Sequence, residues 1–284
     1  MVVASESETG VIELVDVCLD HPRGGALVSE GNLKVMRGEV VVVVGAAGVG
    51  TSRVVAAALG EASARSGRIE VLGRDVGRLR RSSLRLLRRK IGIVPQDLCL
   101  LEDRSAQLNV GLPLEIDGVP RSEWVLRATG LLSQLALEEF TDLPVEQLPS
   151  SARQRVAVAR ALIREPELVI ADHPTSLQDA AGADLVCDAL ADAAAAGAAV
   201  LAFGRDALLR AHAERRNWRT LCLLDGALVP LGEIALDGRS IDEVLVAMES
   251  LPLANPAPAP ADADAEPVPN LVPFPLSART AGVA

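Results

Sequence analysis

The stretch Val40-Val41-Val42-Val43-Val44-Gly45-Ala46-Ala47-Gly48-Val49-Gly50-Thr51-Ser52 decides the fold. Five valines favour a buried strand, and the glycines that follow fit the spacing G-x-x-x-x-G-K-[ST] of a phosphate-binding loop. In such a loop, backbone N–H groups and the start of a helix surround the phosphates of a nucleotide. A lysine is expected before Ser52, but the chain has Thr51 there. The stretch therefore predicts a strand, an anion-binding turn and a helix over 51–64, without the loop's cation.

Three further segments follow in a consistent order. Gln96 comes after the apolar residues 91–95, and the segment 148–162 opens as Leu-Pro-Ser-Ser-Ala before a helix rich in Ala, Val and Arg, from Ala152 to Arg164. The apolar strand 168–172 then ends in Asp172 and is followed by His173. Together these motifs resemble the nucleotide-binding subunit of ABC transporters, over roughly residues 10–231. The resemblance implies an α/β, P-loop NTPase-like fold with a largely parallel core sheet, an N-terminal antiparallel β part and a helical subdomain.

A narrower resemblance is carried by residues 88–97, 100–104, 109–110 and 112–114, and by the closing hairpin 220–228. These segments are similar to the cell-division ATP-binding protein of the FtsEX type, with the lipoprotein-release ATPases as near relatives. The family implies ATP or ADP with Mg²⁺ as the ligand. It also implies a homodimer, or a heterodimer with another ABC subunit, docked beneath a polytopic FtsX-like membrane protein.

Most departures from the family pattern fall on positions that do chemistry. Besides Thr51, the chain has His173 where the family has a water-polarising glutamate and Arg205 where it has a switch histidine. The signature that caps the partner's nucleotide, normally L-S-G-G-Q, reads Leu148-Pro149-Ser150-Ser151-Ala152. Tyrosine is absent from the chain, so the aromatic residue that stacks on adenine in the family is missing unless His21 substitutes. The catalytic motifs are therefore degenerate.

The positions that bind nucleotide and metal are better preserved. Ser52, Gln96 and Asp172 match the family's Mg²⁺ ligands, and oxygen donors of this kind are those that Mg²⁺ prefers. Asp179 keeps the acid of the loop that follows Asp172. The resemblance thus predicts a nucleotide site formed by Gly45, Gly48, Gly50, Thr51, Ser52, Gln96, Asp172 and Arg205.

Two of the substituted residues have open alternatives. Arg205 can bind phosphate bidentately and so offset the missing lysine in binding but not in turnover. His173 either orients water weakly or only fills the space of the glutamate. Each nucleotide in this family lies between one subunit's phosphate loop and the other's signature, so both composite sites are impaired in a homodimer or a heterodimer. Ser150 and Ser151 replace the family's two glycines and hinder close approach to the γ-phosphate, and Pro149 removes a backbone N–H.

Three functions follow from these observations. The first is a weak or non-hydrolysing ATP-binding subunit, a pseudo-ATPase that acts as a structural or regulatory partner of an integral membrane protein. The second is a functional ATPase of an FtsEX or lipoprotein-release complex with compensated residues. The third is an interaction module that does not use nucleotide.

Composition and charge limit the classes of partner and the location expected for the protein. The net charge of −10 disfavours a nucleic-acid binder, and the acidic segment 1–9 is no signal peptide. We expect a cytoplasmic protein that is peripheral on the inner face of the cell membrane through its partner. The basic stretch 78–90 is either a solvated helix face or a contact for anionic lipid or an acidic partner. The scattered cysteines, Cys18, Cys99, Cys187 and Cys222, are expected to be buried free thiols.

The chain divides by composition into four parts. Residues 1–9 are a flexible N-terminus, and 10–231 form the nucleotide-binding domain, with its helical subdomain at about 97–165. Residues 232–251 predict a short helical extension, and 252–284 a Pro/Ala/Asp-rich disordered tail. Within the subdomain, Trp124, Val125, Leu131, Leu132 and Leu135 are the predicted helix-face or core positions.

Overall fold

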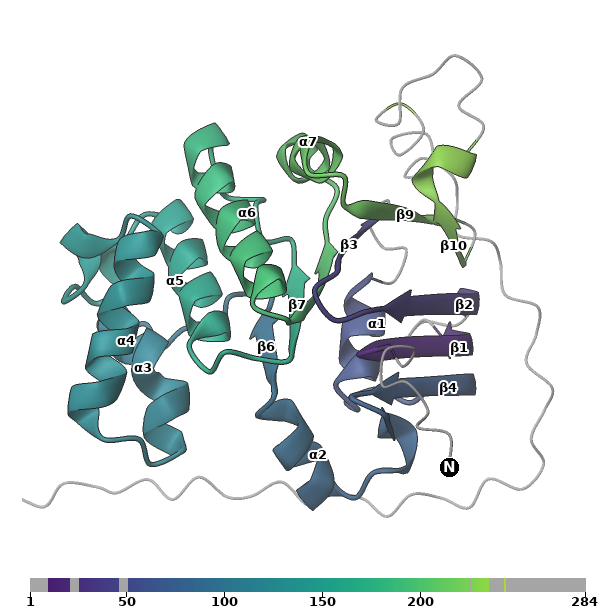
Figure 1. Cartoon of the computed structure of the whole chain (residues 1–284), viewed down its shortest axis with the longest axis horizontal. Coiled ribbons are helices and arrows are strands. Elements are labelled where there is room, and N and C mark those ends of the chain that lie inside the picture. Colours follow the sequence, from purple (N-terminus) through teal and green to yellow (C-terminus); the bar gives the residue numbers. More distant parts are fainter. Residues whose placement is uncertain (1–9, 21–25, 46–50, 225, 235–242, 244–284) are drawn as a thin grey trace, which may run out of the picture.

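The computed structural model describes residues 10–20, 26–45, 51–224, 226–234 and 243. Its architecture is the mixed α/β fold that the sequence predicts: a core sheet, a separate antiparallel sheet and helices packed around them (Figure 1). The predictions for Gly48, Gly50 and His21 lie outside the described residues. So do those for 1–9, for 252–284 and for most of 232–251.

The core sheet has six strands in the order β10-β9-β3-β8-β7-β6. Strands β9, β3, β8, β7 and β6 run parallel to one another, and β10 pairs with β9 in antiparallel fashion. Because parallel strands end at the same edge, the segments that follow β6, β7 and β8 lie together at the edge where β3 also ends. The strands are β3 (Val40–Gly45), β6 (Ile91–Val94), β7 (Leu168–Asp172), β8 (Ala199–Phe203), β9 (Arg219–Leu224) and β10 (Ala227–Pro230).

The second sheet is antiparallel, with the strand order β2-β1-β4-β5. One glycine in it is required by close packing: a Cβ on Gly67, whose φ is +83°, would lie 2.3 Å from the carbonyl oxygen of Asp16. This sheet confirms the predicted N-terminal antiparallel β part. Its strands are β1 (Ile12–Asp20), β2 (Ala26–Val35), β4 (Ser66–Val71) and β5 (Arg74–Asp75).

Two hydrophobic cores meet on β3. Val40, Val42 and Val44 pack into the core that contains the larger helices, whereas Val41 and Val43 pack into the core shared with the antiparallel sheet. Both faces of the strand are therefore buried, which explains its unbroken run of valine. The helices are α1 (Thr51–Ala58), α2 (Arg81–Arg88), α3 (Ala106–Ile116), α4 (Arg121–Gln134), α5 (Ser150–Leu162), α6 (Ala180–Ala195) and α7 (Ala207–Arg215); 3₁₀ turns occupy Val76–Arg78, Glu138–Phe140, Val145–Gln147 and Leu231–Glu233.

Three predicted helix boundaries were wrong. Helix α1 ends at Ala58 rather than at residue 64, because Gly60 takes a φ of +65° and the N–H of Glu61 closes the helix on the carbonyl of Ala56 at 2.8 Å. Helix α5 begins at Ser150, two residues before the predicted start, since Pro149 caps it with a φ of −61°. It ends at Leu162, two residues before the predicted end at Arg164.

The helices α3, α4 and α5 lie side by side at one end of the molecule (Figure 1). Trp124, Leu132 and Leu135 are fully buried there, as the sequence predicts, and Val125 and Leu131 pack against this core. A Cβ on Gly111 of α3 would lie 2.2 Å from the Trp124 ring, so the contact between α3 and α4 requires glycine. None of the helices in the described part of the chain is long and apolar enough to cross a membrane.

The four cysteines are free, as predicted. Cys18, Cys187 and Cys222 are buried, and burial raises the pKa of the Cys187 thiol to about 12. The prediction was wrong for Cys99, which is exposed because it lies in the connection between β6 and α3.

Candidate nucleotide site

The predicted site residues gather at the carboxyl edge of the core sheet. Strand β3 ends at Gly45 and β7 ends at Asp172, which is paired with Phe203 at the end of β8. Arg205 follows two residues later. In open sheets of this kind, ligands bind beyond the carboxyl ends of the strands. The fold therefore brings these segments to the edge where a nucleotide is expected.

Asp172 has a side-chain partner on each of its carboxylate oxygens. The Ser52 hydroxyl, in the first turn of α1, donates to Oδ2 at 3.1 Å. The His173 Nδ1 lies 2.8 Å from Oδ1. The Asp172 side chain is only 5% exposed, so the imidazole and the hydroxyl supply the polar contacts that a buried carboxylate needs. The structure thus brings Ser52, Asp172 and His173 together as one cluster.

The donor set of this cluster fits a magnesium ion. A serine hydroxyl and a carboxylate are hard oxygen ligands, and Mg²⁺ in nucleotide sites takes one or two such protein ligands beside water and phosphate oxygens. Among the described residues there is no group of three His, Cys, Asp or Glu side chains that could hold a metal by itself. The chemistry of Ser52 and Asp172 is therefore that of a nucleotide-dependent magnesium site rather than of an all-protein metal centre.

His173 is held in an unusual backbone conformation. Its φ is +55°, a left-handed value that costs a residue with a Cβ on the order of 1 kcal/mol. Its N–H donates to the carbonyl of Phe203 at 2.7 Å, and its own carbonyl accepts from Gln154 Nε2 at 2.8 Å. These two bonds fix the backbone of His173, so its ring is aimed at Asp172 by the surrounding structure.

A buried glutamine joins the signature helix to the segment after β7. Gln154 on α5 is 2% exposed, and its Oε1 accepts from the N–H of Leu177 at 3.1 Å and from Gln178 Nε2 at 2.9 Å. Gln178 Nε2 also donates to the carbonyl of Ser151 at 2.9 Å. Sequence reasoning missed both glutamines. The available signal was a polar residue on the face of α5 that otherwise carries Ala and Val.

The segment predicted as the signature, 148–152, leads into the beginning of α5. Pro149 is the N-cap of this helix, and among the described residues no side chain caps it. Free N–H groups and the helix dipole therefore still favour an anion near this end. Pro149 and Ser150 are exposed, whereas Ala152 is completely buried, so the Ala152 side chain is not at the surface.

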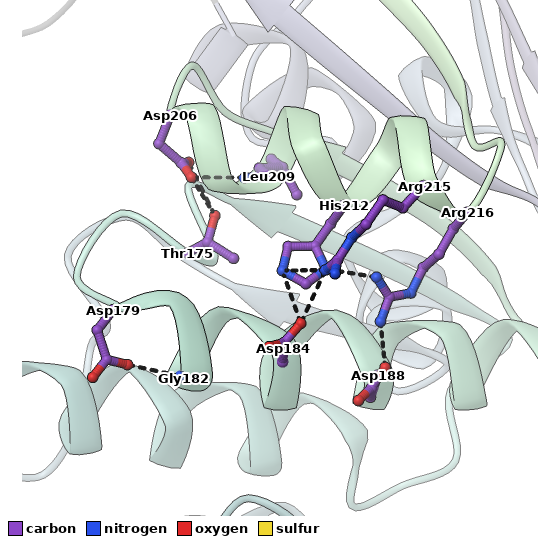
Figure 2. Close-up of polar contacts among 10 residues, drawn as sticks. All are labelled: Thr175, Asp179, Gly182, Asp184, Asp188, Asp206, Leu209, His212, Arg215 and Arg216. Atoms are coloured by element: carbon purple, nitrogen blue, oxygen red, sulfur yellow. Dashed lines mark hydrogen bonds and ion pairs between the residues drawn. The ribbon is translucent and has the colours of Figure 1, made fainter.

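The segment around Arg205 is positioned by the cap of α7. Asp206 accepts from the N–H of Leu209 at 2.9 Å and from the Thr175 hydroxyl at 2.9 Å, which ties this segment to the one after β7 (Figure 2). Arg205 is exposed, and its carbonyl accepts from Arg210 Nη1. The predicted acid Asp179 acts here as the N-cap of α6, accepting from the N–H of Gly182 at 2.8 Å (Figure 2).

Helices α6 and α7 are joined by a cluster of charged side chains around buried His212 (Figure 2). The guanidiniums of Arg215 and Arg216 lie 2.9 Å and 2.5 Å from His212 Nδ1, and Asp184 Oδ1 lies 3.4 Å from Nε2. Arg216 also pairs with Asp188. Burial, with Arg215 and Arg216 nearby, lowers the pKa of His212. This neutral imidazole fixes α7, and hence Asp206, on α6.

Gln96 is not brought into the cluster. It follows β6 at the same edge, but its side chain is exposed and makes no hydrogen bond with the described residues. Thr51 is the first residue of α1 and is half-buried. The structure thus joins the Ser52 and Asp172 predictions by a contact, and it has Gly45, Thr51, Gln96 and Arg205 at the same edge.

The comparison with known proteins agrees with this arrangement. Residues 28–176, more than half of the chain, match the family described as ABC transporter. The chain belongs to the ABC transporter family. It carries an ATP-binding domain of the ABC type.

Several relatives of this ABC domain are named as import ATP-binding proteins. The chain is 38% identical to methionine import ATP-binding protein MetN 2 of Burkholderia mallei over 181 residues, 63% of this chain and 46% of the relative. It is 35% identical to MetN of Geobacillus kaustophilus over 161 residues, 57% of this chain and 47% of the relative. The matched region thus spans about half the length of these relatives. The narrower resemblance to the FtsEX type remains a proposal.

Solved ABC structures share the fold. A dimeric ATP-binding cassette in a post-hydrolysis state, bound to ADP and Pi, is 27% identical with a TM-score of 0.70, covering 76% of this chain and 96% of that one. CbiO1 of Clostridium perfringens matches with a TM-score of 0.68 at 22% identity, covering 85% of this chain and all of that one. The second likeness is evidence for the fold alone.

Proposed function

We propose that this chain is an ATP-binding subunit that binds Mg²⁺ and ATP or ADP weakly and hydrolyses ATP very slowly or not at all. In this role it acts as a structural or regulatory partner of an integral membrane protein. The observation that carries the proposal is the contact at 2.8 Å between His173 Nδ1 and Asp172 Oδ1. An imidazole already bonded to Asp172 stands where the family has a carboxylate free to polarise water.

Two losses reduce catalysis on the hydrolytic side. A general base contributes about 10²–10⁴-fold to a reaction rate, and the nucleotide edge has no carboxylate at position 173 to supply it. Thr51 offers a neutral hydroxyl where a lysine would meet the developing charge on the phosphates. When bound, Mg²⁺ neutralises phosphate charge, but it does not replace either group.

Binding has better support than turnover. Ser52 and Asp172 are in contact at 3.1 Å, and α1 begins at Thr51, so the positive end of its dipole lies beside them. We propose that Arg205, exposed at the same edge, contacts phosphate and partly offsets Thr51. This division of roles predicts a subunit that binds nucleotide measurably but hydrolyses it very slowly or not at all.

The proposed partner is a polytopic membrane protein. A groove of about 470 Å³ lies between α1, α2 and the helices α3 and α5, and its lining includes Leu59, Arg88, Pro113 and Arg164. We propose that a segment of the partner enters this groove and that the chain is peripheral on the inner face of the cell membrane. The partner is FtsX-like if the narrower resemblance holds, and a component of an import system if the names of the relatives apply.

We also propose the following domain limits. Residues 10–231 form the nucleotide-binding domain, with a helical subdomain at about 97–165. The segments 1–9, 232–251 and 252–284 lie outside the functional unit.

The second candidate is a working ATPase. It is favoured by the intact contact between Ser52 and Asp172 and by identity of up to 38% to relatives named import ATP-binding proteins. The third candidate, an interaction module without nucleotide, keeps the fold but not the ligand. Calorimetric titration with ATP and Mg²⁺ separates it from the first two, because only this candidate gives no binding heat.

The decisive test restores the missing groups. The double variant Thr51→Lys with His173→Glu is compared with Thr51→Lys with His173→Gln, which has the same lysine and no carboxylate. Steady-state phosphate release should rise by at least about 100-fold in the first variant and far less in the second. Wild-type turnover equal to that of the first variant would establish the working ATPase. Equal turnover in both variants would show that the carboxylate position is not limiting.

A further inference from the structure

A second hollow lies at the opposite edge of the core sheet. Arg37, Lys90 and Glu167 shortly precede β3, β6 and β7, so they mark the amino edge rather than the nucleotide edge. Together with α2 and the β4–β5 turn they line a pocket of about 840 Å³, here called the amino-edge pocket. Its volume is within the range of small-molecule sites, about 300–1,000 Å³. Figure 1 shows α2 at this end, next to the antiparallel sheet.

The amino-edge pocket is strongly basic in an acidic chain. Four cations, Arg37, Arg74, Arg89 and Lys90, line it with one carboxylate, Glu167, although the whole chain has a net charge of −10. They come from three separate parts of the sequence, and only the fold puts them in one hollow. A concave surface lined by one sign of charge concentrates counter-ions within it.

Glu167 holds two of these cations next to each other. Its Oε2 accepts from Arg37 Nη2 at 2.5 Å and its Oε1 accepts from Lys90 Nζ at 2.7 Å. Lys90 and Arg37 lower the pKa of Glu167, so the carboxylate stays charged. One carboxylate cannot neutralise two cations. It therefore pre-positions a pair that still carries excess positive charge.

The remaining cations are less committed. The Arg74 guanidinium is exposed and has no hydrogen-bond or ion-pair partner among the described residues. Arg89 Nε lies 3.5 Å from Asp117, and Arg164 Nε contacts that same carboxylate at 2.7 Å. The Arg74 and Arg89 side chains can therefore turn toward an anion while few existing contacts are lost.

An apolar surface adjoins the charges. Leu72 is half-buried and Leu86 on α2 is 60% exposed, and both line the pocket, whereas the lining residues Val11 and Leu87 are already buried in the core. An inorganic ion would leave the Leu72 and Leu86 side chains uncovered. A ligand that carries an organic group beside its negative charge would cover them.

We propose that the amino-edge pocket binds an organic phosphate, with the phosphate between Arg37, Arg74 and Lys90 and the organic part against Leu72 and Leu86. The ligand is either a soluble phosphate ester or the headgroup of an anionic phospholipid. This site is separate from the nucleotide edge and does not depend on the function proposed above. It also assigns a role to part of the basic stretch 78–90.

The test uses the full chain with phenyl phosphate as the soluble probe. Calorimetric titration of Arg37→Gln with Arg74→Gln is compared with Arg81→Gln with Arg85→Gln, which removes the same charge from exposed residues that do not line the pocket. The first variant should bind at least about tenfold more weakly and the second within about twofold of wild type, because only the first loses charged hydrogen-bond donors that line the pocket. Arg74→Glu alone, at an unpaired exposed residue, repeats the test with minimal risk to folding.

The second arm uses vesicles of phosphatidylcholine with and without phosphatidic acid. Co-sedimentation that needs phosphatidic acid and is lost in Arg37→Gln with Arg74→Gln identifies the lipid as the source of the ligand. Binding of phenyl phosphate alone identifies a soluble ester. Hydrogen exchange should slow at 72–74 and 86–90 in either case. Equal weakening in both double variants, or no binding of either probe to the wild type, overturns the proposal.

Discussion

The nucleotide edge has a metal side and a hydrolytic side, and they differ in chemistry. On the metal side, Ser52 and Asp172 are the oxygen donors that the family pattern requires, and they are in contact at 3.1 Å. On the proposed hydrolytic side, Thr51, His173 and Arg205 are the residues that depart from the family pattern given by the resemblance. Under the proposed function, binding and cleavage of a nucleotide depend on separable sets of residues at one edge.

The framework behind the hydrolytic side is fully built despite these replacements. Gln154 fixes the carbonyl of His173 at 2.8 Å, and Asp206 caps α7 while accepting from Thr175. Under the proposed function, these bonds keep the shape of the site although turnover is lost.

The largest expected effect concerns the metal side. Asp172→Ala should weaken magnesium-dependent nucleotide binding by about 100-fold, or about 2.7 kcal/mol, because it removes a charged ligand of the metal. His173→Ala, one residue away, should change the affinity by less than about threefold. Titration calorimetry with ATP, with and without Mg²⁺, measures both. Equal losses of nucleotide affinity in the two variants would contradict the distinction between the metal side and the hydrolytic side.

The next effect concerns the framework. Gln154→Leu should lower the free energy of unfolding by about 2 kcal/mol, since the carbonyl of His173 and the N–H of Leu177 lose their buried partner. Gln134→Leu is the control, because Gln134 is exposed and its bond to Asp192 should contribute less than about 0.5 kcal/mol. Urea unfolding gives both values. A Gln154 variant as stable as the control would remove the supporting role of this glutamine.

A smaller effect is expected on the hydrolytic side. Arg205→Ala should weaken nucleotide binding by about tenfold, or about 1.4 kcal/mol, if its guanidinium contacts phosphate. Arg205→Lys keeps the charge and should lose less. The rate of phosphate release should stay near background in both variants. Unchanged affinity in Arg205→Ala would show that Arg205 does not compensate for Thr51.

The smallest effect is on pH dependence, through the α6–α7 cluster. Burial and then Arg215 and Arg216 lower the pKa of His212 despite the opposing charges of Asp184 and Asp188. The unfolded chain therefore binds the proton at higher pH, so stability falls as the pH drops below the unfolded value of about 6.5. One proton changes the free energy of unfolding by at most roughly 1.4 kcal/mol per pH unit. His212→Gln should therefore reduce the slope of unfolding free energy against pH by a fraction of that value. Denaturation midpoints from pH 8 to pH 5 measure it, and a steeper fall in the variant would contradict this sign.

Much of the fold could be predicted from the sequence because its signals are local. The valine run of β3 and the acid that ends β7 appear in the sequence as an apolar strand followed by a polar residue, and both elements are present. Boundaries were less certain where one residue changes the backbone. Gly60 ended α1 early, and Pro149 started α5 two residues before Ala152.

The site could be predicted only in part. The contact between Ser52 and Asp172 follows from two motifs that the family places together. The bonds of Gln154 and Gln178 depend on how α5 packs against the segment after β7, which no spacing reveals. The amino-edge pocket needs Arg37, Arg74 and Lys90 to converge from distant segments, so the sequence shows only a basic stretch.

Steady-state phosphate release by the purified wild-type chain, with ATP and Mg²⁺ and with Asp172→Asn as the background control, tests the central claim most directly. We predict release that does not exceed this background although nucleotide binding is measurable by calorimetry. Release that is rapid, depends on Mg²⁺ and is abolished by Asp172→Asn would contradict the account.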